Sequence, residues 1–328
     1  MAVAGGDPAP RRWPPPGAVR HGARSGPTYR PQRAHLCLTA AMSSGQTAGG
    51  VRYERRRLDA AEHRYWHEIW SAMPTAVAAE HGAELREFGP VQANVIRDLP
   101  AVGMLNLVLG ATAPGAVAGG HLETALEWTR DQDVAAYVPV TPELPETEIA
   151  EALVTAVGLS PGYPWMKFLR DAHPPRFKAP DDVEVTEIGA DSGEPFATIV
   201  AAGFGLPAWA ASLFAGLPGR QGWRCYVARV DGETGACGAM LLDGEVAVFG
   251  PSATLEPARR RGCQLALLRR RIEDAVTTGC RLLFVETGAR VESRPAGSYR
   301  NILRAGFEEA YLCPNWQLSG GGGDAADA

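Results

Sequence analysis

The chain of 328 residues lacks several features by which common classes of site are identified. Its six cysteines are scattered, and no two of them have the Cys-x-x-Cys spacing of a zinc or redox site. No stretch approaches the roughly 20 consecutive apolar residues of a membrane-spanning helix. We therefore expect reduced cysteines in a cytoplasmic protein, with no disulfide framework, no metal and no membrane partner.

Histidine is scarce as well, and none follows His173. A Ser-His-Asp triad or a histidine-based metal centre built within the C-terminal half is therefore excluded. In the N-terminal half, His63 and His67 are four residues apart and could hold a metal from one helix face. No third ligand accompanies them, and aromatic neighbours such as Trp66 favour an amphipathic packing helix.

Acidic residues are almost missing from the first 50 positions, where Asp7 stands among arginines, prolines and glycines. We expect residues 1–55 to be disordered, because this composition cannot bury enough apolar surface to fold. A targeting peptide is the alternative, and Met42 is an alternative start. The glycine-rich tail at 319–328 is expected to be disordered too. The net charge of −5 argues against a general nucleic-acid binder.

What the sequence does contain is a repeated order of strand and helix patterns. With 45% hydrophobic residues, it has the length and apolar content for two domains. We predict an α+β fold in which each of two domains, at 56–175 and 176–318, has a mixed sheet flanked by helices. A stretch rich in proline and charge at 171–182 predicts the linker between them.

The two halves share a register. Gly158 corresponds to Gly306 and Tyr163 to Tyr311, both at a separation of 148 positions. Each glycine closes a helix pattern, and each tyrosine lies at a strand pattern that follows. A common register across helix and strand indicates a duplicated unit.

The most informative stretch is residues 259–262, Arg-Arg-Arg-Gly, between an apolar strand pattern and a helix pattern. The first amides of a helix have no partner inside it and carry the positive end of its dipole. Glycine allows a phosphate to approach the backbone, and arginines add charge. The turn is a candidate phosphate cradle; the alternative is an ordinary helix start with solvated arginines. At the equivalent position of the first half, residues 113–120 read Ala-Pro-Gly-Ala-Val-Ala-Gly-Gly and include no basic residue. We therefore expect the second half to carry the chemistry.

Residues 183–318 resemble the GNAT superfamily of N-acetyltransferases. The turn matches the signature Arg-x-x-Gly-x-Gly/Ala except that Gln264 stands in the last place, and 301–307 resemble the family's closing helix and its Gly-Phe cap. The first half resembles a degenerate copy. The resemblance implies two tandem GNAT-like domains and direct transfer of an acetyl group from acetyl-CoA to an amine.

By position, the resemblance assigns the CoA pyrophosphate to the amides of the turn and the pantetheine arm to the preceding strand. Asn301 is placed near the thioester. The implied cofactor-binding residues are Ala253, Thr254, Leu255, Arg259, Arg260, Arg261, Gly262, Cys263, Gln264, Leu265 and Asn301. The proline that usually precedes the arginine is displaced by one position, with Glu256 in its place.

Acetyl transfer needs a base for the amine and an acid for the departing thiolate. Glu286, at the end of a buried strand pattern, is the candidate base, since burial would raise its pKa. The alternative is a strand-end carboxylate in an ion pair. Many family members have a tyrosine where this chain has Ile302, so Tyr299 is the candidate acid and Tyr311 the alternative. Cys263 would face the cofactor phosphates, so we expect no nucleophilic role for it.

The expected function is transfer of the acetyl group of acetyl-CoA to a primary amine of a small molecule or peptide. One alternative, motivated by the missing tyrosine, is a catalytically inactive sensor or scaffold that binds CoA or acetyl-CoA. Another is phosphate or nucleotide binding without acyl chemistry. We expect no nucleic-acid partner, and a homodimer is an open alternative for the assembly. The acceptor cleft is expected between the halves near Phe204, Trp209, Trp223 and Phe249, which could equally be core.

Overall fold

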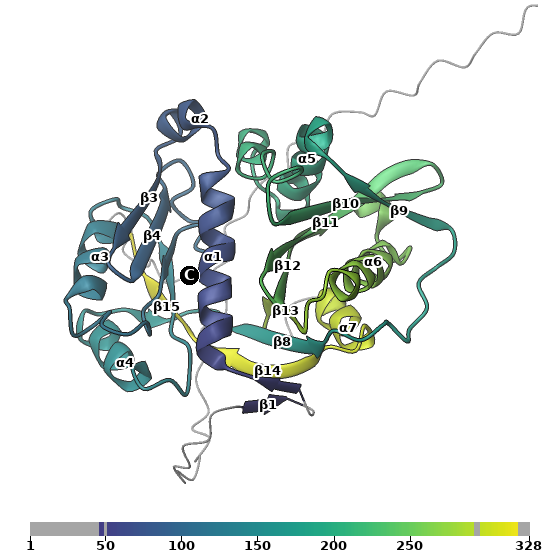
Figure 1. The fold of residues 1–328 in the computed structure, drawn as a ribbon. Coiled ribbons are helices and arrows are strands. Elements are labelled where there is room, and N and C mark those ends of the chain that lie inside the picture. Colours follow the sequence, from purple (N-terminus) through teal and green to yellow (C-terminus); the bar gives the residue numbers. More distant parts are fainter. Residues whose placement is uncertain (1–45, 49–50, 292–295, 321–328) are drawn as a thin grey trace, which may run out of the picture.

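The structure is a computed structural model in which two mixed β-sheets are flanked by helices (Figure 1). It describes the ranges 46–48, 51–291 and 296–320. The other residues of the two ends predicted to be disordered, 1–55 and 319–328, lie outside the described ranges, and Met42 is among them. The predicted α+β class, with one mixed sheet in each half, is confirmed.

The N-terminal half begins with two short paired strands that lie inside the segment predicted to be disordered. A long helix follows, and its buried stripe of Leu58, Ala61, Tyr65 and Ile69 has the three- and four-residue spacing of one helix face. The elements are β1 (Gln46–Ala48), β2 (Val51–Tyr53), α1 (Arg55–Ser71), α2 (Thr75–Glu80), β3 (Ala83–Phe88), β4 (Val91–Ile96), β5 (Leu107–Leu109), α3 (His121–Arg130), β6 (Ala136–Pro139), α4 (Thr147–Ala156), β7 (Ser160–Pro161) and β8 (Trp165–Asp171).

The C-terminal half has three long antiparallel strands before its main helix. Asp231 and Gly232, both with positive φ, join two of them in the hairpin predicted there. The elements are β9 (Val183–Ile188), η1 (Ala190–Ser192), α5 (Gly193–Phe204), η2 (Ala208–Leu213), β10 (Trp223–Val230), β11 (Glu233–Asp243), β12 (Val246–Thr254), η3 (Glu256–Ala258), α6 (Cys263–Thr277), β13 (Leu282–Gly288), α7 (Gly297–Arg304), β14 (Glu308–Cys313) and β15 (Asn315–Leu318).

The two sheets repeat one pattern of strand directions. The first has the order β3-β4-β5-β6-β15-β7 and the second β10-β11-β12-β13-β8-β14, with β9 added beside β10. In each sheet the third and fourth of these strands, β5–β6 or β12–β13, are parallel, and the other neighbours are antiparallel. The duplication predicted from the register is therefore visible in the topology.

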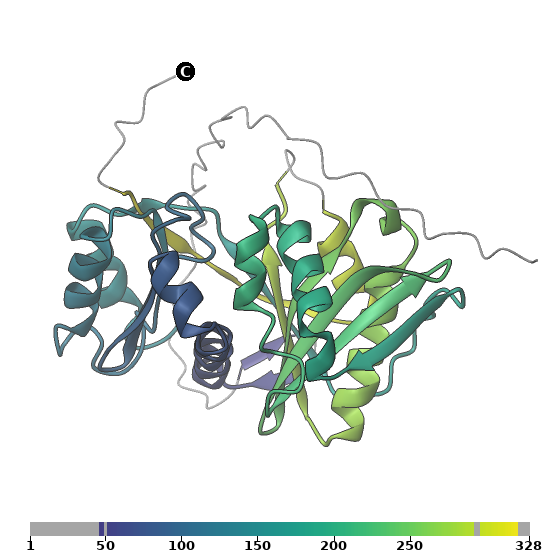
Figure 2. The same ribbon diagram turned by 90° about the horizontal axis from the view of Figure 1, so that it is seen from above.

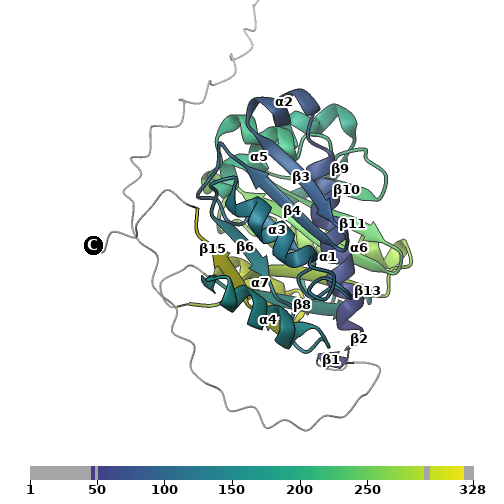
Figure 3. The ribbon, with the colours of Figure 1, turned by 90° about the vertical axis from the view of Figure 1, so that its left-hand side faces the viewer.

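Each half gives a strand to the other. β8, which ends the first half, lies between β13 and β14 of the second sheet, and β15, from the end of the second half, lies between β6 and β7 of the first. Figures 1 and 3 show the late, yellow strand β15 among the blue and teal elements of the first half. Neither sheet is complete without a strand from the other half of the sequence.

Three cores follow from this arrangement. Helices α3 and α4 cover the outer face of the first sheet, and α6 and α7 cover one face of the second. The largest core lies between the halves, where α1 and α5 pack with the facing sides of both sheets. Figure 2 shows α1 nearly end-on between the two sheets. In the described part of the chain, no helix combines the length and apolarity needed to cross a bilayer.

Candidate functional site

The site forms where two parallel strands part. β12 pairs with β13 from Val246 to Phe249 and no further. Beyond that point β12 continues to pair with β11, through Ala253 and Thr254, on its other side only. Among the described strands, the last residues of β12 therefore have one free edge, which can pair with an extended ligand.

The turn after β12 has the backbone of an anion-binding loop. Arg260 and Gly262 both have positive φ, 64° and 82°. Helix α6 begins at Cys263 without a side-chain cap. None of the described hydrogen bonds uses the N–H groups of Cys263, Gln264 or Leu265 as donors to the turn. Free amides at the positive end of a helix dipole attract an anion. A Cβ on Gly262 would lie 2.3 Å from the Cγ of Pro180, so glycine is also required by space.

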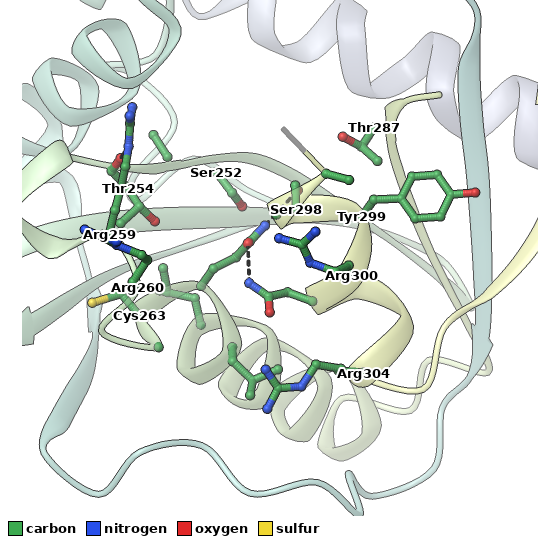
Figure 4. Close-up of a pocket in the computed structure, with 18 of the residues that line it drawn as sticks. Ser252, Thr254, Arg259, Arg260, Cys263, Thr287, Ser298, Tyr299, Arg300 and Arg304 are labelled. Atoms are coloured by element: carbon green, nitrogen blue, oxygen red, sulfur yellow. Dashed lines mark hydrogen bonds between the residues drawn. The ribbon is translucent and has the colours of Figure 1, made fainter. Parts of the chain in front are cut away.

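A cavity of about 1330 Å³ opens over this turn (Figure 4). None of the described residues that line it is Asp or Glu. The basic residues that line it are Lys178, Arg259, Arg260, Arg261, Arg290, Arg300 and Arg304. Because cations are in excess and no carboxylate occurs among the described lining residues, this cavity is suited to a polyanion.

The three arginines of the turn are not equivalent. Arg261 makes ion pairs with Asp231, at 3.0 Å, and Asp182, at 3.5 Å. Arg259 donates from Nε to the carbonyl of Thr254 at 3.4 Å, and Arg260 has no carboxylate partner among the described residues. Arg259 and Arg260 are therefore available to a ligand, whereas Arg261 fixes the turn to its neighbours.

Gln264, which replaces the usual glycine or alanine, joins two helices. Its amide nitrogen donates to Ser298 Oγ at 2.8 Å, and its amide oxygen accepts from Asn301 at 2.8 Å. Asn301 lies in the wall of this cavity, with its amide nitrogen bonded to Gln264. The structure brings the predicted cofactor residues 253–254, 259–265 and 301 to one cavity; Leu255 is not part of its lining.

Tyr299 also lines this cavity, but its hydroxyl donates to Glu309 at 2.6 Å. Burial and the bond to Glu309 raise the pKa of Tyr299 well above its usual range. The alternative, Tyr311, belongs to the core between the halves, and the guanidinium of Arg55 lies 4.3 Å from the centre of its ring. The Tyr299 hydroxyl is bonded to Glu309 and Tyr311 lines neither cavity, so their part in acid catalysis stays a prediction.

A second cavity, of about 610 Å³, adjoins the first and lies between the halves. The residues common to both linings mark the junction, which lies where β12 and β13 separate. They are Tyr163, Ser252, Gln264, Thr287, Gly288 and Ser298. A ligand held at the turn can therefore reach the second cavity through this junction.

Glu286 lies in the wall of the second cavity and shares a buried lysine with another carboxylate. Lys167 Nζ donates to Glu286 and to both carboxylate oxygens of Glu62, at 2.6 and 2.7 Å. Burial and the charge of Glu286 raise the pKa of Glu62 to about 8, with Lys167 opposing them. Burial would lower the pKa of Lys167, but both carboxylates outweigh it and hold that pKa well above its ordinary range.

This cluster joins α1, β8 and β13, and it was not apparent from the sequence. The ion-pair alternative for Glu286 is observed, and at the same time Glu286 and Glu62 both face the cavity. The available signal was Lys167 itself, one of only two lysines in the chain, in the middle of an apolar strand pattern. A buried lysine requires carboxylate partners, but the sequence does not say which.

Of the four aromatic residues expected at the acceptor cleft, the structure brings two together. Phe204 and Phe249 line the second cavity. Trp209 instead stacks on His81 with 3.6 Å between ring centres, and Trp223 packs in the core beside Tyr65. Among the described residues, no group of three or more His, Cys, Asp or Glu side chains is placed to hold a metal.

Comparison with solved structures identifies the fold. A GCN5-related N-acetyltransferase from Kribbella flavida is similar to this chain with a TM-score of 0.50 and 17% identity, covering 79% of this chain and 96% of that protein. The chain has the GNAT fold. The expected resemblance is thereby confirmed at the level of the fold.

Other GNAT structures align at a similar level. A GCN5-related N-acetyltransferase from Sphaerobacter thermophilus has a TM-score of 0.49 and 15% identity, covering 70% of this chain and 76% of its own. A tandem GNAT protein from the clavulanic acid biosynthesis pathway has a TM-score of 0.48 and 17% identity, covering 71% of this chain and 79% of that protein. No protein-family model and no curated protein matches the sequence.

Proposed function

We propose that this GNAT-fold protein transfers the acetyl group of acetyl-CoA to a primary amine. The observation that carries the proposal is the continuity of two cavities. One has free helix amides and cations, with no carboxylate among its described lining residues, and the other contains Glu62 and Glu286. This arrangement suits a phosphorylated acyl donor at one end and a basic acceptor at the other.

The residues present fit a CoA thioester. The free amides of Cys263 and Gln264, with Arg259 and Arg260, can hold the pyrophosphate. Further cations of the same cavity, Arg300 and Arg304, can bind an additional phosphate. The free edge of β12 can hydrogen-bond the amides of the pantetheine arm. The acyl end then lies at the junction of the cavities.

Glu286 and Glu62 supply the base in this proposal. An ammonium acceptor gives one proton to the carboxylate cluster, and the neutral amine nitrogen then attacks the thioester carbonyl. The C–N bond forms, the C–S bond breaks, the thiolate takes up a proton and the nitrogen loses its second one. The net products are an acetamide, CoA thiol and one proton. Because the pKa of Glu62 is raised to about 8, the cluster can exchange a proton near neutral pH.

A sensor that binds acetyl-CoA without transferring it is the second candidate. It is favoured by the bond from the Tyr299 hydroxyl to Glu309, which leaves that candidate acid engaged with protein.

Calorimetric titration with acetyl-CoA, CoA and ATP tests the cofactor assignment. We expect acetyl-CoA and CoA to bind at one site per chain and ATP to bind more weakly. Tight binding of ATP with no binding of acetyl-CoA would refute the proposal. If acetyl-CoA binds, thiol release with a panel of amines separates the enzyme from the sensor: release that depends on the amine supports transfer, and its absence with every amine supports the sensor.

A further inference from the structure

The half of the chain that lacks the arginine turn contributes part of the wall of the second cavity. Helix α1 provides Glu62, Tyr65 and Trp66, and residues 101–105 and Tyr137 provide further wall. The N-terminal half is therefore part of the acceptor side of the site. Its contribution determines which acceptor fits.

Aromatic side chains from both halves line this cavity. Six of the aromatic residues that line it are Tyr65, Trp66, Tyr137, Trp165, Phe249 and Phe284. Aromatic faces bind planar apolar groups and also attract a cation placed over them. Polyamines and sugars would leave this surface poorly covered, whereas an aromatic ring would bury it.

One residue in the lining points to a ligand. Phe204, at the end of α5, is 41% exposed although it borders an apolar cavity. A ligand ring can cover it.

Two carboxylates in the wall can hold an ammonium group. Lys167 is fully buried and offsets one of them, and Glu62, whose pKa is raised to about 8, adds the second negative charge once it has lost its proton. Arg271, the other cation in the wall, keeps its positive charge but makes hydrogen bonds within the protein. It donates to the carbonyls of Leu267 and Ala239 at 3.1 and 3.0 Å and lies 4.9 Å from the ring centre of Phe249.

From these observations we infer that the acceptor is an aromatic primary amine without a carboxylate. Its ring lies among the aromatic walls and its ammonium against Glu62 and Glu286. This inference rests on the proposed function, because it names the acceptor of the same transfer. The reaction is the one balanced above, with the aromatic amine as the nucleophile.

The test compares amines with and without an aromatic ring or a carboxylate. 2-Phenylethylamine has an aromatic ring and an ammonium group, L-phenylalanine adds a carboxylate, and spermidine and glucosamine lack the aromatic ring. We expect kcat/KM for 2-phenylethylamine to exceed that of each of the others by about tenfold or more, the scale set by one unpaired charge or one unburied ring. A preference for L-phenylalanine would overturn the inference, because Arg271 would then bind the carboxylate. A preference for spermidine or glucosamine would overturn it as well.

A surface variant tests the ring site without disturbing the core. Phe204→Ala should raise the KM for 2-phenylethylamine several-fold and leave the calorimetric affinity for acetyl-CoA unchanged, because Phe204 does not line the first cavity. Ile149→Ala is the matched control, since Ile149 is 48% exposed on α4 of the first half and borders neither cavity. Equal KM values for both variants would count against the aromatic site.

Direct binding keeps the inference separate from the proposed function. In the presence of saturating CoA, 2-phenylethylamine should bind in calorimetry and spermidine should not, whether or not transfer occurs. If acetyl-CoA fails to bind, the proposed function fails. If acetyl-CoA binds but the aromatic amine does not bind to the CoA complex, only the acceptor inference is overturned.

Discussion

The main helices of the two halves, α3 and α6, begin with the same backbone geometry, but different residues surround the two helix starts. Helix α3 starts after Gly120, with φ 69° and ψ 8°, and helix α6 starts after Gly262, with φ 82° and ψ 4°. Neither has a side-chain cap. The backbone geometry of a phosphate-binding helix start is therefore present twice, and geometry alone does not decide which one binds an anion.

Two differences separate them. In the first half, the carbonyl of Ala116 accepts from the N–H of Leu122, the second residue of α3, at 2.9 Å. The equivalent N–H in α6, that of Gln264, makes no such bond in the described structure. The first loop also has no basic residue, whereas cations surround the second. A helix N-terminus becomes an anion site when its amides are free and the nearby charge is positive.

The first half has a different contribution. It supplies Glu62 and aromatic wall to the acceptor cavity, and its strand β8 carries Lys167 into the second sheet. The comparison therefore predicts that changes in the two halves affect different properties. Changes at the turn of the second half should alter the affinity for the acetyl donor, and changes in the first half should alter stability and the choice of acceptor.

The largest effect is expected at Lys167. Lys167→Met leaves two buried carboxylates without their cation, so the free energy of unfolding should fall by about 3–5 kcal/mol. Denaturant unfolding measures this, with Lys178→Met, at the only other lysine, as the control. Adding Glu62→Gln to Lys167→Met should restore part of the loss. Equal stability of the two lysine variants would show that the cluster does not hold the halves together.

Reversal of charge at the turn should act on ligand affinity. Arg259→Glu with Arg260→Glu should weaken acetyl-CoA binding by about 100-fold, because two cations facing phosphates become anions. The control is Arg176→Glu with Arg229→Glu, which makes the same change of net charge outside the first cavity. Calorimetry at low salt compares the two. A similar loss in both would mean that only the overall charge matters.

The raised pKa of Glu62 predicts a dependence of stability on pH. A carboxyl group whose pKa is higher in the folded state stabilises most at low pH and loses this contribution as pH rises through the folded value. The free energy of unfolding should therefore fall between about pH 5 and pH 8 by about 1 kcal/mol or more. Glu62→Gln should remove most of this slope. An identical slope in wild type and variant would contradict the assignment.

The smallest effect is expected when positive charge is added to the loop before α3 in the first half. Pro114→Arg with Ala118→Arg adds two cations at exposed positions before α3. Because the amide of Leu122 remains occupied by Ala116, no second binding site should appear. The stoichiometry of acetyl-CoA should stay at one per chain in calorimetry. A value of two would show that charge alone separates the halves.

Several parts of this structure could be predicted from the sequence because their signals are local. The arginine turn and the strand-helix order depend on residues next to each other. The hairpin at Gly89 that joins β3 and β4 was missed, although a Gly-Pro turn separates the two strand patterns. A Gly-Pro turn between two short strand patterns is a local signal of a hairpin.

The strand exchange and the buried cluster could not be predicted in this way. The patterns of β8 and β15 indicate strands but not the sheet that each one joins, since pairing depends on contacts distant in sequence. Glu62, Lys167 and Glu286 lie on three separate elements. Their meeting follows from the exchange, so the cluster became visible only with the fold.

The assignment of acetyl-CoA to the turn of the second half is tested most directly by changing the two capping glycines one at a time. Gly262→Trp should abolish binding of acetyl-CoA, because the side chain would fill the cradle and strain a left-handed residue. Gly120→Trp makes the same change at the equivalent cap of the first half, where a Cβ meets nothing within 4 Å. Calorimetry on both folded variants should show no binding for Gly262→Trp and one acetyl-CoA per chain, with wild-type affinity, for Gly120→Trp. Unchanged binding in Gly262→Trp, or its loss in Gly120→Trp, would contradict the account.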